Sequence, residues 1–311
     1  MYKYYIITII SIALAVQSYS QTMSKSQINT ILGQQKYYPK IRDINKLQAI
    51  DELLLRVKYD YSYVIDTAKM SRYSEPMILD IGKITNRYYS YNSYLRDSMQ
   101  MAENKNGPVS SGGGYGYRNI THLVIPKDQT ATYLDVFTNH NTQDRDVALR
   151  IDTREFVYNE KLEQIKWQFI DTAKTSILGY NCMVAESYFR GRKWRVWFTV
   201  DIPYPYGMWK LNGLPGIILK GEDSQGFFKW QAVGIENGRE RKIYRYNENI
   251  KWSKRDDVEK LWQRMWCAPH TLNYLFKVDK TINVSLPDGT WHEVKVDMSI
   301  AQRFYPKLEL E

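Results

Sequence analysis

The sequence predicts a mainly β fold, either a strongly curved antiparallel sheet or an open β-barrel, with one or two covering α-helices. From residue 53 to 65, apolar or aromatic side chains alternate with polar ones, which marks a long strand with one buried face. The chain holds 26 Tyr and 9 Trp, residues that suit strands with one dry and one wet face. Strand-like segments do not alternate regularly with helices, which disfavours a doubly wound fold.

Further strands are expected along most of the chain. Met77 to Tyr91 predicts a second strand, interrupted at Gly82. Other segments with strand composition lie at 121–126, 131–138, 155–158, 164–170, 180–189, 194–201, 217–220, 227–235, 241–247, 281–286 and 291–298. The run from Leu286 to Thr290 has the Pro-Asp-Gly composition of a turn, so we expect a hairpin at about 281–298.

Two segments break the strand pattern. Residues 106–117 contain three consecutive glycines and predict a loop, without the spacing of a phosphate-binding turn. The segment at about 253–266 predicts a helix, with Ser253 as its N-cap and Pro269 beyond its end. Its apolar residues recur at helical spacing on one stripe, so we expect the helix to lie across the sheet.

The first twenty residues predict a signal peptide. Lys3 supplies positive charge, residues 6–16 form a short apolar run, and small residues precede Gln21, the expected start of the mature chain. The run is shorter than the roughly 20 residues of a membrane span, so we expect no transmembrane segment in the mature chain. The expected location is the periplasm or the outer membrane.

After the signal we expect an N-terminal extension at 21–50 and a single β domain at 51–311. The formal net charge is +9, which could indicate a nucleic-acid partner. The basic residues are dispersed among acidic ones, however, and form no polybasic run. We therefore expect no nucleic-acid partner.

The run Leu211-Asn212-Gly213-Leu214-Pro215-Gly216-Ile217-Ile218 predicts a structural turn. Pro215 presets the second position of a β-turn, and Gly216 can adopt the positive φ that a type II turn needs next. Gly213 adds backbone freedom. The run holds no nucleophile, acid or base. We expect the segment before this run to contact a partner or ligand instead, through Tyr204, Tyr206 and an exposed Trp209.

This run belongs to a longer stretch that resembles the GLPGLI family of exported Bacteroidetes proteins. The matching segments are Ile177 to Cys182, Phe189 to Thr199 (F-x-G-R-x-W-x-x-W-F-T in the family), Ile202-Pro203, and Gly207 to Ile218. Met208 stands where the family has Pro, and Ile217-Ile218 replaces Leu-Ile. The resemblance continues at lower density from about Leu53 to about residue 275. It implies export, but the family has no settled biochemistry.

Arg190 and Arg192 flank Gly191 at an expected bend between strands. They could bind an anion through their guanidinium groups, or form a hairpin corner with stems over Trp194 or Trp197. Those two tryptophans project to opposite faces of one strand, so only one can point inward. We take Arg190, Arg192 and Trp197 as further candidate contacts.

The two cysteines, Cys182 and Cys267, could pair in an oxidising compartment, or Cys182 could simply pack as a small apolar residue. The four histidines, His122, His140, His270 and His292, show no zinc-binding spacing, so we expect no metal and no cofactor. Three Asp-Ser/Thr-apolar tripeptides resemble the O-glycosylation sequon of Bacteroidetes and give candidate sites at Thr67, Ser98 and Thr172.

The sequence shows no constellation that would activate a nucleophile. We therefore expect an exported envelope protein that binds an envelope protein or an apolar ligand on its curved sheet without catalysis. The alternative is a periplasmic hydrolase acting on an envelope polymer or glycan. It would use carboxylates from different strands, such as Asp201 and Glu222.

Overall fold

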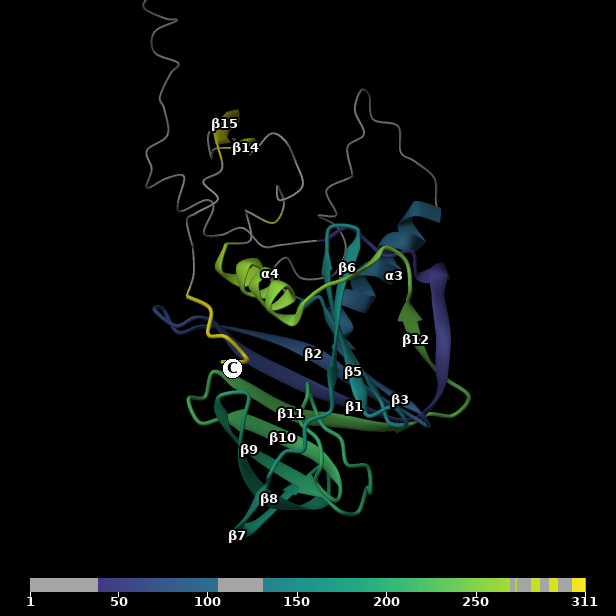
Figure 1. The fold of residues 1–311 in the computed structure, drawn as a ribbon, viewed down its shortest axis with the longest axis vertical. Helices are drawn as coiled ribbons and strands as arrows, with labels where there is room; N and C mark the ends of the chain where they lie inside the picture. Colours follow the sequence, from purple (N-terminus) through teal and green to yellow (C-terminus); the bar gives the residue numbers. More distant parts are fainter. Residues whose placement is uncertain are drawn as a thin grey trace, which may run out of the picture.

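The fold is one large open sheet with two covering helices, as the sequence predicts (Figure 1). The computed structural model describes residues 39–105, 131–268, 272, 281–285, 291–295 and 304–310. The side chains of residues 100, 103–105, 172–174, 281–285 and 291–295 lie outside this description. The predicted strand at 121–126 and loop at 106–117 also lie outside it, as does Pro269.

The sheet path holds twelve strands, and β12 pairs with β1 off that path. Along the sheet the order is β13 (Ile250–Trp252), β6 (Arg154–Lys161), β5 (Asp144–Ile151), β4 (Leu134–Asn139), β3 (Thr85–Ser90), β2 (Ser71–Gly82), β1 (Leu47–Asp66), β11 (Phe228–Asn237), β10 (Ile217–Asp223), β9 (Arg192–Thr199), β8 (Tyr180–Phe189) and β7 (Gln168–Ile177), with β12 at Lys242–Tyr246. Neighbours pair antiparallel except β13 and β6, which are parallel.

Strand β1 joins the two halves of the sheet. Its first residues pair with β12, and from Leu55 onward it pairs with β11 instead. Strand β12 leads through a short turn into β13, which pairs with β6. The start of β1 together with β12 and β13, which we call the arm, therefore lies over the β2–β6 part of the sheet (Figure 1). The strand begins at Leu47, preceded by the 3₁₀-helix η1 (Ile44–Lys46).

The inner face of the sheet, which carries Tyr59, Tyr61 and Tyr63 of β1, is filled by packed aromatic side chains. The Tyr61 and Trp230 rings stack at 4.5 Å, and Trp194 lies 5.7 Å from Trp230. Of the pair on β9, Trp194 is therefore the inward residue. Trp197 is half-buried on the outer face, where the Lys220 ammonium lies 4.1 Å from its ring. Packed rings occupy the place where we expected an apolar ligand.

Helix α4 (Arg255–Cys267) covers this inner face, as its apolar stripe predicts. Val258, Trp262, Met265 and Trp266 are buried, and Trp266 meets Tyr63 at 5.2 Å between ring centroids. The predicted N-cap is wrong. Lys254 occupies that position without a side-chain cap bond, while the Ser253 hydroxyl donates to the Lys251 carbonyl.

Several elements differ from the prediction. The expected strand from Met77 to Tyr91 is a hairpin of β2 and β3, because the chain reverses directly after Gly82. Strands β5 and β13 and helix α3 (Tyr91–Lys105) were not expected. The C-terminal hairpin is present as β14 (Thr281–Ser285) paired antiparallel with β15 (Trp291–Lys295).

Candidate functional site

The motif segment, residues 207–216 before β10, packs against the inner face, but it does not form the predicted type II turn. The tight turn lies earlier, where the Leu211 amide donates to the Met208 carbonyl at 3.1 Å and Trp209 has a φ of 53°. Gly213 has the expected positive φ, at 90°. Gly216 does not have a positive φ. A Cβ there would lie 1.9 Å from the Thr199 carbonyl oxygen, so close backbone approach is what requires this glycine.

The predicted exposed patch before the turn is largely covered. Trp209 is buried, with its ring 5.6 Å from Trp194 and 5.8 Å from Phe189. Tyr206 is half-buried and stacks on His140 at 4.5 Å, and Tyr204 is also half-buried. The prediction that Trp209 is exposed was wrong, because the turn at Met208–Leu211 directs its ring into the aromatic core.

Arg190 and Arg192 form a hairpin corner, as one of the two interpretations proposed, but their charges are neutralised within the chain. Arg190 has a φ of 51° and Gly191 one of 71°, the pair of positive values that a two-residue hairpin turn requires. Arg190 pairs with Glu160 at 3.0 Å and Arg192 with Asp223 at 3.0 Å. Their guanidinium groups lie near phenylalanines rather than near Trp194 or Trp197.

Lys210 of the motif segment lies at the centre of the buried charge cluster to which Arg190 also belongs. Its ammonium lies 2.9 Å from a Glu160 oxygen and 2.6 Å from a Glu309 oxygen, and it donates to the Tyr158 hydroxyl at 2.9 Å. Burial lowers the pKa of Lys210, and the two carboxylates oppose that shift. Burial would raise the pKa of Glu160, but the cations around it, led by Lys210, lower it overall.

The outer face of the sheet carries polar side chains from β3, β4 and β5. Thr85, Arg87 and Tyr89 share this face of β3, and Asp135, Phe137 and Asn139 share it on β4, because alternate residues of a strand point the same way. The arm formed by the start of β1, β12 and β13 lies over it. Two hollows lie under this arm along the same strands, and they differ in how they are lined.

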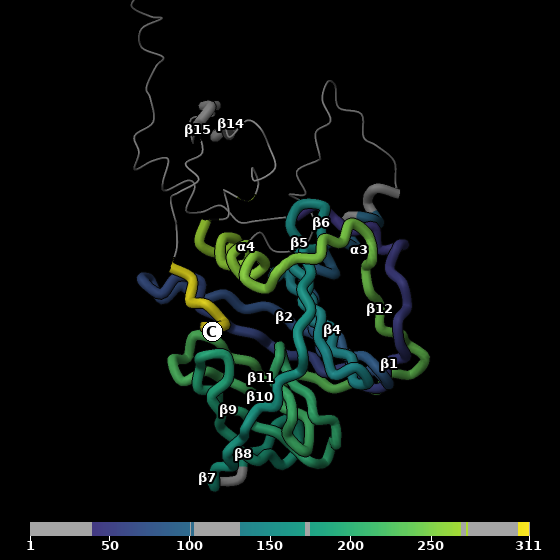
Figure 2. The backbone as a smooth tube through the Cα atoms, in the orientation of Figure 1, coloured from purple at the N-terminus to yellow at the C-terminus, as the bar shows by residue number. Residues whose placement is uncertain are grey.

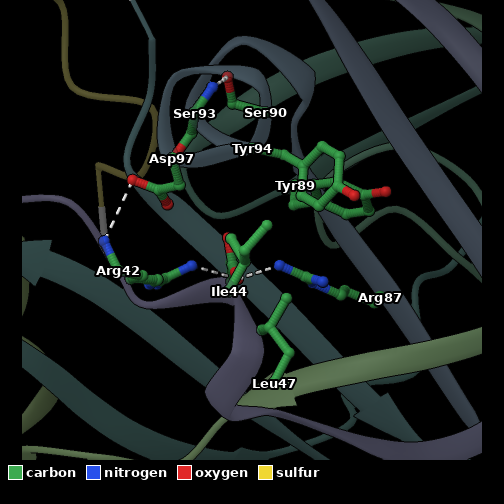
Figure 3. A pocket seen from close by; sticks show the side chains of 10 residues that line it. Arg42, Ile44, Leu47, Arg87, Tyr89, Ser90, Ser93, Tyr94 and Asp97 are labelled. Atoms are coloured by element: carbon green, nitrogen blue, oxygen red, sulfur yellow. Dashed lines mark hydrogen bonds and ion pairs between the residues drawn. The ribbon is translucent and has the colours of Figure 1, made fainter. Parts of the chain in front are cut away.

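The first hollow, which we call the ion-paired pocket, is almost closed. Arg42 and Arg87 both pair with Asp135, at 3.2 and 2.7 Å, and Figure 3 shows the two arginines pointing toward one another from opposite sides of the pocket. Arg42 also makes a bidentate contact with Glu155 at 2.7 and 2.6 Å, and its amide donates to Asp97. The remaining volume is about 10 Å³, room for about one water molecule.

The second hollow, which we call the polar groove, is open and much larger. Its volume is about 400 Å³, within the range of small-molecule sites. The groove is lined by residues from seven strands: Ile50, Thr85, Phe137, Asn139, Asp144, Asp146, Asn159, Arg245 and Trp252. Trp252 is 60% exposed, which is unusual for so large an apolar side chain.

The polar side chains of this groove are held in place by one another. Asp146 accepts from Asn159 at 2.8 Å and pairs with Arg245 at 2.7 Å. The Arg245 guanidinium in turn lies 4.8 Å from the centre of the Phe137 ring. Asp144 accepts a hydrogen bond from Thr142 at 2.7 Å. The groove therefore presents fixed carboxylate and amide groups beside an exposed indole, an arrangement that no local sequence motif predicts.

The remaining candidate residues do not gather in either hollow. Cys182 lies on β8 beside the edge strand β7 and Cys267 at the end of α4 (Figure 1), and no disulfide joins them. Asp201 is exposed beyond β9, and Glu222 lies on β10 opposite Arg195. His122 and His270 lie outside the described residues, as does the side chain of His292. Among the described residues no cluster of His, Cys, Asp and Glu could hold a metal ion.

The candidate O-glycosylation sites remain predictions. Thr67 is half-buried and its hydroxyl donates to the Phe304 carbonyl, while Ser98 is half-buried on α3. The side chain of Thr172 lies outside the described residues. In the described part of the chain, neither helix is long and apolar enough to span a bilayer.

Similarity to known proteins is limited to a weak structural likeness. No family model matches the chain, and neither does any curated protein. Two crystal structures of PNGF-II, in space groups P21 and C2, align at 12% identity with a TM-score of 0.44. The alignments cover 75% of this chain but 35% and 34% of PNGF-II, so the chain spans about a third of that protein's length. A likeness this weak carries no functional information.

Proposed function

We propose that this protein is an exported carbohydrate-binding protein whose ligand lies in the polar groove. The observation that carries the proposal is the exposed Trp252 beside the fixed polar groups of Asp144, Asp146 and Asn159. A sugar ring has an apolar C–H face, which can stack on an indole, and a rim of hydroxyl groups. Carboxylates accept hydrogen bonds from hydroxyls, and amides both donate and accept them.

The contents of the two faces favour this ligand over an apolar one. The aromatic residues of the inner face are packed against each other and buried, whereas the groove on the outer face combines one exposed aromatic side chain with charged and amide groups. An apolar ligand in the groove would displace water from these carboxylates and amides without supplying the hydrogen bonds that water makes to their remaining donors and acceptors. A hydroxyl-rich ligand supplies them.

Binding can be tested by calorimetry with purified protein and soluble glycans identified on a glycan array. Trp252→Ala should weaken binding at least about tenfold, since stacking of a ring on tryptophan is worth roughly 1–3 kcal/mol by analogy with base–aromatic stacking. Its melting temperature should be unchanged, because the side chain is mostly exposed. Trp197→Ala is the matched control, as Trp197 is half-buried on the same face outside the groove lining. Loss of binding in the control alone would place the site elsewhere.

The hydrolase alternative draws on the same carboxylates. Asp144 and Asp146 are two residues apart on β5 and face the groove together. From the strand rise their Cα atoms are roughly 6–7 Å apart, near the carboxylate separations of glycoside hydrolases. Release of reducing ends from a bound glycan, lost in Asp144→Asn, would support hydrolysis. Unchanged glycan after prolonged incubation would leave binding as the function.

Export rests on residues 1–20 and on the resemblance to the GLPGLI family. We expect the mature chain to start at or near Gln21. N-terminal mass spectrometry of protein from the envelope fraction would check this. Intact residues 1–20 on that protein would contradict export by this signal.

A further inference from the structure

Residues 304–310 form an extended segment that lies in a groove built from other parts of the chain. Figure 2 shows this yellow segment between α4 and the β9–β10 part of the sheet. It contains neither helix nor strand. Tyr305, Pro306, Leu308 and Glu309 are buried, while Phe304, Lys307 and Leu310 are exposed. We call its surroundings the segment groove, formed by Arg190, Arg192, Lys210, Phe228, Arg255 and Trp266.

The contacts resemble those of a protein with a bound peptide. Arg192 donates to the backbone carbonyls of Lys307 and Leu308, and the Leu310 amide donates to the Arg190 carbonyl at 3.0 Å. The Tyr305 ring stacks on Trp266 at 5.4 Å between centroids. Backbone contacts fix an extended chain, and a side-chain pocket adds selectivity for its sequence.

The glutamate of the segment supplies a charge that the groove needs. Its carboxylate lies 2.6 Å from Lys210, 2.6 Å from Arg255 and 3.7 Å from Arg190. The four cations of the cluster, Lys210, Arg145, Arg190 and Arg255, pair with Glu160, Glu163, Glu259 and Glu309. Without Glu309 there are four cations and three acids, and the fully buried Lys210 keeps only Glu160. The empty groove would therefore attract a carboxylate.

Three of the residues that line the segment groove come from residues 189–218, the stretch that carries the family resemblance. Arg190 and Arg192 belong to the β8–β9 turn, and Lys210 follows Trp209 in the turn at Met208–Leu211. The segment does not fill all the space beside it, because a hollow of about 210 Å³ remains between α4 and residues 305–310. The site thus has room for a bulkier occupant.

We propose that the segment groove is a peptide-binding site for an extended, glutamate-containing segment of a partner protein, with the pattern aromatic-Pro-x-Leu-Glu. Residues 304–310 occupy the groove when no partner is bound. Charge complementarity defines the partner, since the glutamate of its segment replaces Glu309 against Lys210 and Arg255. This inference is independent of the polar groove on the opposite face.

The test uses a fluorescent peptide with the sequence of residues 304–310, titrated into the full chain and followed by anisotropy. Glu309→Lys should displace the chain's own segment, so this variant should bind the peptide at least about tenfold more tightly than the wild type. A peptide with Gln in place of its Glu should lose most of that affinity. Adding Lys210→Met to the variant should abolish binding, whereas adding Lys58→Met, which removes an outer-face lysine paired with Glu236, should not.

Equal binding by Glu309→Lys and the wild type would overturn the proposal, and so would a peptide affinity that does not depend on its glutamate. Exchange of the segment between two copies, detected as a dimer of the variant by light scattering, would replace the partner with a second copy and overturn the partner version. If Glu309→Lys does not fold, hydrogen exchange of the wild type decides. The Leu310 amide should exchange much faster than amides of β1, and equal protection would mark the segment as a fixed part of the core.

Discussion

The ion-paired pocket and the polar groove lie along the same strands of one sheet face, yet the pocket is a structural ion-pair cluster and the groove is an open site. Both contain carboxylates, arginines and aromatic rings. The pocket is covered by the segment before β1, from which Arg42 reaches Asp135 and Glu155. Among the described residues no segment closes the groove in this way, although the arm borders it, and Trp252 is mostly exposed.

This difference shows that residue type alone does not separate a structural cluster from a binding site. In the pocket each carboxylate faces a guanidinium from a distant part of the chain, and the remaining volume holds about one water. In the groove the carboxylates are fixed by their neighbours but still border open space. The presence of a covering segment decides which polar groups remain available to a ligand.

The largest expected effect on stability comes from removing a cation from the ion-paired pocket. Arg42→Met would leave Glu155 and Asp135 buried with one cation fewer, and removing one partner of a buried pair typically costs about 3–5 kcal/mol. Urea unfolding would measure this loss. The matched variant is Arg245→Met in the groove, where Arg245 and Asp146 are 20% and 17% exposed and Asn159 still donates to Asp146.

We expect Arg245→Met to cost about 1 kcal/mol, as for partly exposed ion pairs. Its effect should appear in ligand affinity instead. Equal losses of stability in the two variants would mean that the ion pair of the groove stabilises the fold as much as those of the pocket. That result would remove the basis of the comparison.

A smaller effect follows from two buried acids in opposite environments. The cations Arg87 and Arg42 overcome the effect of burial and lower the pKa of Asp135, whereas burial raises the pKa of Glu75 to about 7 despite hydrogen bonds from Ser90, Thr132 and Tyr63. Asp135 therefore stabilises the fold above its unfolded pKa, and this contribution is lost as the pH falls. Glu75 binds its proton more tightly in the folded state, so its contribution is complete below about pH 4.5 and is lost as the pH rises to about 7.

Glu75→Gln should remove that loss. Between pH 5 and 8 the wild type should lose on the order of 3 kcal/mol of unfolding free energy from this group, and the variant should lose much less. Chemical denaturation at several pH values measures the slope. Parallel slopes for the two proteins would show that Glu75 does not titrate in this range.

The parts of the fold that follow from local patterns were predictable. The alternation in β1 and the apolar stripe of α4 each identified an element and its buried face. Strand β5 was missed because Arg145, Asp146 and Arg150 interrupt its apolar pattern. These charges are tolerated only because residues distant in sequence neutralise them, as Asp97 does for Arg150 at 2.6 Å.

The candidate sites were harder to predict. The polar groove collects one or two residues from each of seven strands, and Trp252 belongs to a strand of only three residues. One signal was available. Polar residues at alternate positions of successive strands indicate a solvent-exposed sheet face, and an isolated tryptophan near them indicates a candidate binding site. The segment groove had no such signal, because the partner of Arg190 and Lys210 lies about 100 residues further along the chain.

The smallest expected effect extends the comparison of closed and open surroundings to the backbone. A Cβ on Gly216 would meet the Thr199 carbonyl oxygen at 1.9 Å, so Gly216→Ala must displace backbone. Overpacking of this kind costs about 1–3 kcal/mol. Gly234→Ala on β11 is the matched control, because its Cβ would meet only the Lys58 side chain at 3.7 Å, an ordinary contact. In thermal unfolding, Gly216→Ala should therefore have a lower melting temperature than the wild type, and Gly234→Ala should have one close to it. Equal melting temperatures for the two variants would mean that the motif segment can move away from β9, and that the inner face is less tightly closed than its packing indicates.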